Sequence, residues 1–314
     1  MNLVEMQNRI KTIVNEKYGL QAFAVLNIEG ILSMEKLLFN DDLNCKVKNM
    51  LTKILRDNYL SETTELDSAE NIEDNRKIFY EIVQNEDYRP FSFLDTYNSI
   101  TNIYSDKNID HIMGLVFRIN VNNTAVWLYQ QIVYPQLIKR SRNLYAMLFN
   151  GSVYKPLDKD VLKIENKIDI LIIDASIITS NIGLMQRVFQ FESFVRKEAD
   201  KTIQMISDME IIDNLEVFTS LGDQKALANA KKLMKAKKSP VLRMDKNLLL
   251  SKLETLPRYK NKFEIENQKI KICTQKQASE FLKMLNDSIL KSELTNAEYD
   301  SSVKKELSPL RNDE

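Results

Sequence analysis

The residues most suited to chemistry are the basic side chains between positions 223 and 262. This window holds twelve Lys/Arg and three Asp/Glu, a net charge of +9. On a helical wheel of residues 223–238 the apolar and basic side chains separate onto two sides: Ala226, Ala230, Leu233 and Met234 on one, Lys225, Lys231, Lys232, Lys235 and Lys238 on the other. A row of ammonium groups suits a repeating phosphate backbone but reads no base sequence. The pattern indicates an anionic partner.

A solvated helix surface is the alternative interpretation, because lysine is a good helix former and charged runs usually face water. The five lysines, however, have no acidic residue four positions away to relieve their repulsion. Lys237 falls outside the row. The wheel alone leaves both interpretations open.

A second candidate is the acidic cluster around Glu165-Asn166-Lys167, with Asp158 before it and Asp169 and Asp174 after it. Carboxylates that hold Mg²⁺ beside a lysine could form a metal-dependent nuclease. Two observations count against this: Asn166-Lys167 suits a hairpin turn, and alternation along a strand sends neighbouring side chains to opposite faces. We therefore expect no catalytic residue and no metal site, and keep the nuclease as an alternative.

Composition excludes several other chemistries. The single histidine, His111, is expected to be structural, and it leaves no Ser-His-Asp triad or His-rich zinc site. Six scattered glycines form neither a dinucleotide-binding nor a P-loop motif, so we expect no cofactor and no small-molecule substrate. Cys45 and Cys273 form no CxxC pair and fit a reducing cytoplasm. No apolar run approaches the ~20 residues of a membrane span.

Several elements are expected to position these groups. Apolar spacing predicts helices over 3–17 and from Asp41 or Asp42 to about residue 55, with a strand over 21–28 between them. Three hairpins are predicted in succession: 112–121 with 124–134 around Asn122-Asn123, 144–149 with 152–157 around Asn150-Gly151, and 161–165 with 168–174 around Asn166-Lys167. Three hairpins imply an antiparallel meander.

Helices replace strands after about residue 180. We predict one helix over 183–209, a second over 223–238 that ends before Ser239-Pro240, and a third opened by a capping box at Thr274 and Gln277. The fold class is thus α+β. A 1–180 domain contains the antiparallel sheet with flanking helices, a mainly helical basic domain covers 181–300, and 301–314 form a disordered tail.

The acidic stretch 57–87 carries ten Asp/Glu against Arg76 and Lys77. Residues 61–75 read as a loop and 76–84 as a strand. The stretch could mimic nucleic acid or rest against the basic helix, but a solvated loop is the simpler expectation.

The C-terminal region resembles a known family. Residues 281–295 read FLKMLNDSILKSELT and are followed by Tyr299 and Lys304-Lys305, and Ile168–Asp174 then leads to a helix with Phe189 and Phe191. This sequence is similar to the KwaB family, the cytoplasmic component of the Kiwa antiphage defence system. The resemblance covers about residues 140–305, and Asn296 stands where the family pattern has Gly. Asn286, Asp287, Ser292, Glu293 and Thr295 are expected to cap backbone groups.

The resemblance implies a cytoplasmic DNA-binding effector that interferes with phage DNA replication or expression. It further implies a homodimer that works beside the membrane protein KwaA, which would recruit it to the inner face of the membrane. It transfers no catalytic residue. Combined with the lysine row, it assigns DNA binding to Lys225, Lys231, Lys232, Lys235, Lys238, Arg243 and Lys246. A protein-interaction adaptor without direct DNA binding is the other alternative, with the basic face meeting an acidic loop of KwaA or residues 57–87.

Overall fold

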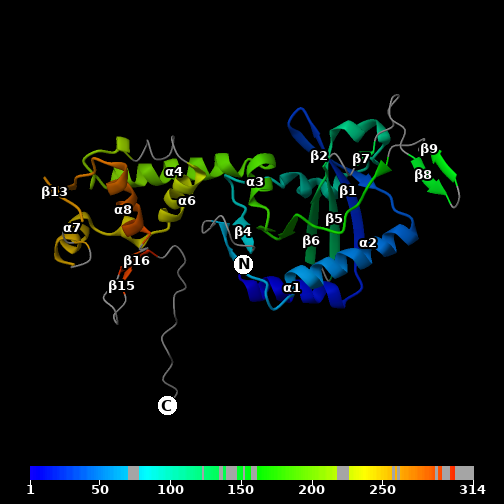
Figure 1. Ribbon diagram of the computed structural model, residues 1–314, viewed down its shortest axis with the longest axis horizontal. Helices are drawn as coiled ribbons and strands as arrows, with labels where there is room; N and C mark the ends of the chain where they lie inside the picture. The colour runs from blue at the N-terminus through cyan, green and yellow to red at the C-terminus, as the bar shows by residue number, and fades with distance from the viewer. Residues whose placement is uncertain are drawn as a thin grey trace, which may run out of the picture. The chain divides into compact units, whose positions relative to one another are not determined.

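The computed structural model divides the chain into two compact units, which are described separately (Figure 1). Unit 1 comprises Met1–Ser68 and Asp74–Leu184, and unit 2 comprises Ala69–Glu73 and Met185–Glu314. The structure describes residues 1–69, 78–121, 124–133, 137–138, 147–150, 153–156, 161–217, 226–256, 259, 262–286, 289–291 and 298–300. The α+β class expected from the sequence is confirmed.

Unit 1 is built on an eight-stranded sheet with the order β2-β1-β5-β6-β11-β12-β4-β3. All neighbouring strands are antiparallel except β3 and β4, which are parallel. The strands of this sheet are β1 (Gly19–Ile28), β2 (Ile31–Leu37), β3 (Leu66–Ser68), β4 (Phe79–Val83), β5 (Ile112–Val121), β6 (Thr124–Gln131), β11 (Ile170–Ile173) and β12 (Ser176–Thr179). Two smaller pairs join β7 (Leu137–Ile138) to β10 (Val161–Leu162) and β8 (Met147–Asn150) to β9 (Val153–Pro156).

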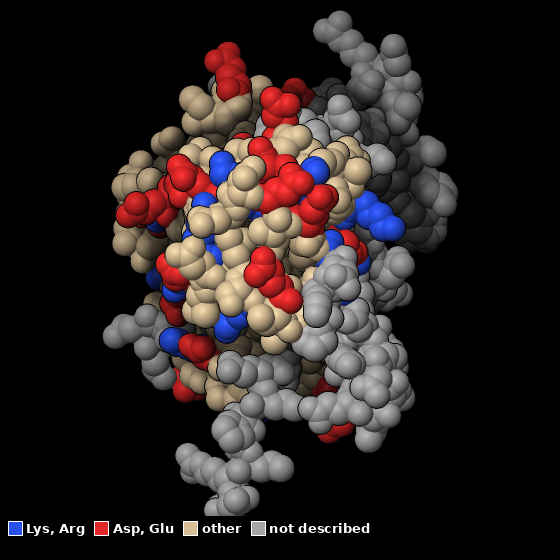
Figure 2. All heavy atoms as spheres, turned by 90° about the vertical axis from the view of Figure 1, so that its left-hand side faces the viewer, with Lys and Arg blue, Asp and Glu red and all other residues tan. Residues whose placement is uncertain are grey.

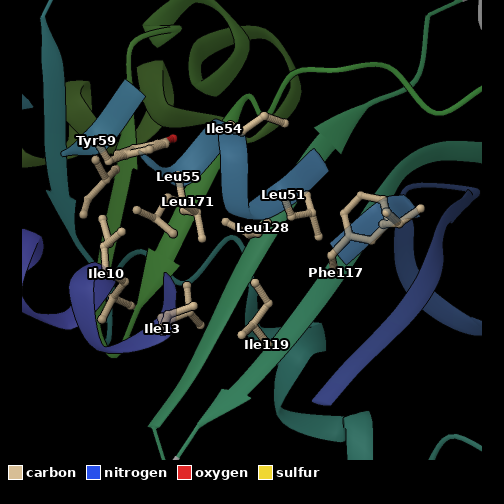
Figure 3. Packing of buried hydrophobic residues seen from close by; sticks show 14 of the residues in the cluster. Ile10, Ile13, Leu51, Ile54, Leu55, Tyr59, Phe117, Ile119, Leu128 and Leu171 are labelled. Atoms are coloured by element: carbon tan, nitrogen blue, oxygen red, sulfur yellow. The ribbon is translucent and has the colours of Figure 1, made fainter. Parts of the chain in front are cut away.

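Two helices, α1 (Leu3–Asn15) and α2 (Asp41–Ile54), pack on one face of the sheet (Figure 3). Each buries apolar residues at positions i, i+4 and i+7: Met6, Ile10 and Ile13 in α1, and Val47, Leu51 and Ile54 in α2. They meet Phe117 and Ile119 of β5, Leu128 of β6 and Leu171 of β11, all fully buried. The short π-helix η1 (Leu55–Tyr59) continues α2 and adds Tyr59 to this core.

The opposite face of the sheet holds the residues that alternate with this core. Trp127 of β6 contacts Phe23 of β1, and Phe91 contacts Tyr129. The 3₁₀ helices η3 (Ser92–Ser99) and η4 (Asp106–His111) belong to the segment between β4 and β5. Arg118 lies 4.1 Å from the ring centre of Tyr97, whose own ring stands edge-on to Trp127.

Several predictions for unit 1 need correction. The first two hairpins are confirmed by pairing of Val121 with Thr124 and of Asn150 with Val153, although the turn residues between these pairs lie outside the described residues. The third hairpin is wrong: β10 pairs with β7, whereas β11 pairs with β6 and β12. The actual turn after β11 is Asp174-Ala175, where Asp174 adopts a positive φ of 52°.

The N-terminal half also differs in detail from the prediction. Asn40, rather than Asp41 or Asp42, caps α2 by accepting a hydrogen bond from Leu43 N. The β1–β2 hairpin was not predicted; Glu29 and Gly30 form its turn, both with positive φ. In the acidic stretch, β4 confirms a strand, but β3 occupies part of the predicted loop 61–75.

Unit 2 is mainly helical (Figure 1). Its elements are α4 (Phe191–Asp208), α6 (Ala226–Ala236), the 3₁₀ helix η6 (Pro240–Arg243), α7 (Lys246–Thr255), α8 (Gln275–Leu285), and the pairs β13 (Ile265–Glu266) with β14 (Lys269–Ile270) and β15 (Ile289–Lys291) with β16 (Glu298–Asp300). The helix α3 (Ile182–Val188) spans the boundary between the units. The continuous helix predicted over 183–209 is therefore wrong, because Gln190 adopts a left-handed φ of 54° between α3 and α4.

Candidate nucleic-acid interface

The predicted basic helix exists as α6, with shorter bounds than expected. Its described part lies at Ala226–Ala236 and packs against α4 and α8. Ala230, Leu233 and Met234 are buried as the helical wheel predicted. Lys237 and Lys238 form a turn directly after the helix. Ser239 then caps the 3₁₀ helix η6, which begins at Pro240.

The lysine row is interrupted. Lys231, expected on the solvent side, is only 8% exposed, which corrects the prediction for this residue. The reason is that α6 packs against two helices, α4 and α8. More of its circumference is therefore buried than in a helix that packs against the protein on one side only. Lys235 is half-buried, and Lys225 lies outside the described residues.

Lys237, the residue outside the predicted row, has a structural role. Its ammonium lies 2.6 Å from Oε2 of Glu198, and Lys201 Nζ lies 2.7 Å from Oε1 of the same carboxylate. The Glu198 side chain is only 7% exposed. Burial alone would raise the pKa of Glu198, but hydrogen bonds and the charges of both lysines outweigh burial and lower the pKa. This ion triplet ties α4 to the end of α6.

Three cations of the predicted site are exposed: Lys232 on α6, Lys238 in the turn and Arg243 at the end of η6. Residues 231–244 contain six basic side chains and no carboxylate. Lys232 and Arg243 form no ion pair within the described part of the chain. Lys246 donates a 2.9 Å hydrogen bond to the backbone oxygen of Glu210, which leaves its positive charge uncompensated.

Backbone contacts fix the conformation of this exposed segment. Ser239 Oγ donates to the carbonyl of Leu285 and accepts from Val241 N, and Asn286 Nδ2 donates to the carbonyl of Lys232. Asn286 therefore has the structural role expected for it, whereas Asp287, Ser292, Glu293 and Thr295 lie outside the described residues. The predicted capping box at Thr274 and Gln277 is confirmed.

Basic residues do not dominate the face drawn in Figure 2. On the face of the molecule drawn in Figure 2, acidic and basic side chains are interspersed and no continuous basic surface is visible among the described residues. Near β13 and β14, for example, Lys271 lies 3.5 Å from both Glu264 and Glu266.

Among the described carboxylates of the nuclease alternative, Glu165 and Asp169 are bridged by Lys167, whose Nζ lies 3.5 Å from the first and 3.9 Å from the second. Glu165 pairs with Lys163 and Lys167, Asp169 accepts a 2.8 Å hydrogen bond from Gln131 N, and Asp174 lies 3.5 Å from Arg9. Asp158 lies outside the described residues. Within the described ranges, no group of three or more His, Cys, Asp or Glu side chains is arranged to hold a metal ion.

No helix of the described part of the chain is both long enough and apolar enough to cross a membrane. The family model for "Kiwa protein KwaB-like" matches residues 109–295, which is more than half of the chain. The chain therefore belongs to the KwaB-like family of Kiwa proteins. The family name associates it with Kiwa antiphage defence. No curated protein and no solved structure matches it significantly.

Proposed function

We propose that this Kiwa protein binds DNA without sequence specificity through the exposed cations of residues 231–246. The observation that carries the proposal is the exposure of Lys232, Lys238 and Arg243 within residues 231–244, which contain no carboxylate. The guanidinium of Arg243 can donate two hydrogen bonds to one phosphate, and the lysines supply point charges. Lys235 and Lys246 add positive charge nearby in sequence.

Lys231 and Lys237 take no part in the proposed contact. Lys231 is buried and Lys237 pairs with Glu198, so neither ammonium group is available to a phosphate. A charge-reversal experiment should leave both residues unchanged, because substitution would confuse loss of folding with loss of binding.

The test is a titration of labelled duplex DNA, followed by fluorescence anisotropy. The variant carries Lys232→Glu, Lys238→Glu and Arg243→Glu, and we expect its affinity to fall by about hundredfold or more. The control carries Lys11→Glu, Lys17→Glu and Lys53→Glu, which are exposed residues of unit 1 with the same total change in charge. Equal loss in both variants, or in neither, would refute the assignment to this segment.

We further propose that the chain acts by binding rather than by catalysis. Incubation of DNA with the protein and Mg²⁺ or Mn²⁺ should leave the DNA intact. Cleavage that disappears in a Glu165→Ala variant would instead support the nuclease alternative.

The interference with phage DNA replication or expression, the membrane partner KwaA and the homodimer belong to the same proposal. A pull-down with KwaA and a molar-mass measurement in solution test the two assemblies. If the triple variant loses KwaA while its DNA affinity is unchanged, the basic segment is an adaptor surface and not a DNA-binding site.

A further inference from the structure

Unpaired cations gather on the two helices that cover one face of the sheet in unit 1. Residues 6–15 and 43–56, which form most of α1 and α2 and reach into η1, contain six Lys/Arg and no Asp/Glu. Arg9 and Lys46 each pair with a carboxylate. The other four, together with Lys17 just after α1, form no ion pair within the described part of the chain; these five cations are Lys11, Lys17, Lys48, Lys53 and Arg56.

The carboxylates of this region stand at the ends of the helices. Glu5, Asp41 and Asp42 lie in first turns, where a negative charge interacts favourably with the helix dipole. Glu16 follows α1, and Asp57 lies in η1. The middle of each helix therefore carries positive charge only.

The five cations lie on the outer side of the helices, since the inner side is buried in the core of unit 1 (Figure 3). Four of them are exposed and Lys48 is half-buried. Hydrogen bonds join the two helical segments: Tyr18 OH donates to the backbone oxygen of Lys48 at 2.8 Å, and Gln7 Nε2 donates to that of Tyr59 at 3.4 Å. Because both helices lie on the same face of the sheet, the five cations belong to one surface, the α1–α2 surface.

The shape of the α1–α2 surface suits a lipid bilayer better than a nucleic acid. Two neighbouring helices form a layer about 20 Å wide, whereas the major groove of DNA is about 12 Å wide and admits a single helix. The sequences of α1 and α2 contain no aromatic residue that could stack on the bases of a single strand. Anionic lipid headgroups instead form a flat, laterally mobile array of negative charge, which dispersed lysines can meet as point charges.

An exposed apolar side chain beside the cations supports the same choice. Val4 is 65% exposed, and on a helical wheel it falls next to Lys11, on the side of α1 away from the buried Ile10. A valine gains little against a phosphate backbone in water, whereas at a membrane it can enter the border between the headgroups and the acyl chains. Cations with an exposed apolar neighbour therefore fit a membrane interface.

We propose that the α1–α2 surface binds the anionic surface of a lipid bilayer directly, with both helices lying flat against it. Each Lys or Arg close to such a surface strengthens binding by about fivefold, so several unpaired cations together give a reversible attachment. A bilayer of neutral lipids offers no such attraction. The contact belongs to unit 1, requires no membrane partner and does not depend on DNA binding by unit 2.

Co-sedimentation of the full-length protein with lipid vesicles tests the contact. One set of vesicles is phosphatidylcholine alone, and the other contains about one-third phosphatidylserine as the anionic lipid. We expect binding to the anionic vesicles only. The bound fraction should fall sharply as the salt concentration rises from about 0.1 M to about 1 M, because the Debye length shortens from about 10 Å to about 3 Å.

Two variants that each lose three positive charges localise the contact. The unit 1 variant carries Lys11→Gln, Lys17→Gln and Lys53→Gln, all at exposed positions. We expect it to bind anionic vesicles about hundredfold more weakly than the wild type, from three factors of about five, with its DNA affinity unchanged. The matched control in unit 2 should bind these vesicles as the wild type does and lose DNA affinity; it carries Lys232→Gln, Lys238→Gln and Arg243→Gln.

Three results would overturn the proposal: the wild type binds anionic vesicles no better than neutral ones, the unit 1 variant binds them as tightly as the wild type, or the control loses as much vesicle affinity as the unit 1 variant. A unit 1 variant that loses DNA affinity instead of vesicle affinity would make the α1–α2 surface a nucleic-acid contact and overturn the proposal as well. Thermal unfolding of each variant verifies that it is folded. Vesicle binding and DNA binding respond to different variants, so the two proposals fail or succeed separately.

Discussion

The two units organise their polar and apolar residues differently. Unit 1 is held by a continuous apolar core between one sheet face and two helices, and its arginines Arg9 and Arg89 pair with carboxylates. Unit 2 also buries apolar residues of α4, α6, α7 and α8, and it adds specific polar contacts between its elements, among them the Glu198 ion triplet and the Ser239 hydrogen bonds. In unit 2, some basic side chains therefore form internal ion pairs and others are exposed to solvent. The number of lysines in a stretch of sequence thus exceeds the number available to a polyanion.

The largest expected effect comes from opening the core of unit 1. Phe117→Ala should lower the free energy of unfolding by about 3–5 kcal/mol, because it removes a fully buried ring and leaves a cavity. Urea denaturation followed by Trp127 fluorescence measures it. Ile31→Ala, at a 72% exposed position of β2, should cost less than about 1 kcal/mol. Similar costs for the two variants would contradict the assigned core.

The next effect tests the polar contacts of unit 2. Glu198→Gln should cost about 1.5–3 kcal/mol at neutral pH, because it removes the ion pair with Lys201 and the charge-assisted hydrogen bond from Lys237. Glu192→Gln is the control; this exposed carboxylate on the same helix pairs with Arg196, and its loss should cost about 0.5 kcal/mol or less. If Glu198→Gln is as mild as the control, the triplet does not hold unit 2 together.

Glu198 also predicts a pH dependence. Its pKa in the folded state lies below the ordinary value of 4.5, so ionised Glu198 stabilises the fold above that pH. This contribution is lost as the pH falls through the lowered folded pKa. Denaturation curves of the wild type and Glu198→Gln should therefore converge at acidic pH. A difference that is constant with pH would mean that the charge of Glu198 does not matter.

The smallest effect concerns the start of α8. Thr274→Ala removes the side chain that accepts from Gln277 N and should cost about 1 kcal/mol. Chemical denaturation at neutral pH measures the change. Lys276→Ala, an exposed position in the same turn, should be nearly neutral, and a larger loss there than at Thr274 would contradict the capping box.

The sequence predicted correctly those helices and hairpins that neighbouring residues determine. Apolar spacing predicted α1 and α2, the β5–β6 hairpin followed from its Asn-Asn turn, and Thr274 with Gln277 marked the start of α8. The prediction of the third hairpin was wrong because β11 pairs with β6, which is distant in sequence. The turn-forming dipeptide Asn166-Lys167 carries no information about that pairing. The break between α3 and α4 at Gln190 was not predicted, because neither Gly nor Pro stands at this position.

The sequence predicted which basic residues lie in the candidate site, but it did not predict which of them are exposed. A helical wheel treats a helix as covered on one side, whereas α6 packs against two helices and buries Lys231. Nothing near Lys237 in sequence indicates Glu198, which lies 39 positions away.

The salt dependence of DNA affinity tests the central claim most directly. Log affinity is plotted against log salt concentration for the wild type and for a variant with Lys232→Gln, Lys238→Gln and Arg243→Gln. If these three cations bind phosphates, the slope should be shallower in the variant by about 2–3, close to one for each cation that is neutralised. Parallel lines for the two proteins would contradict the assignment of DNA binding to this segment.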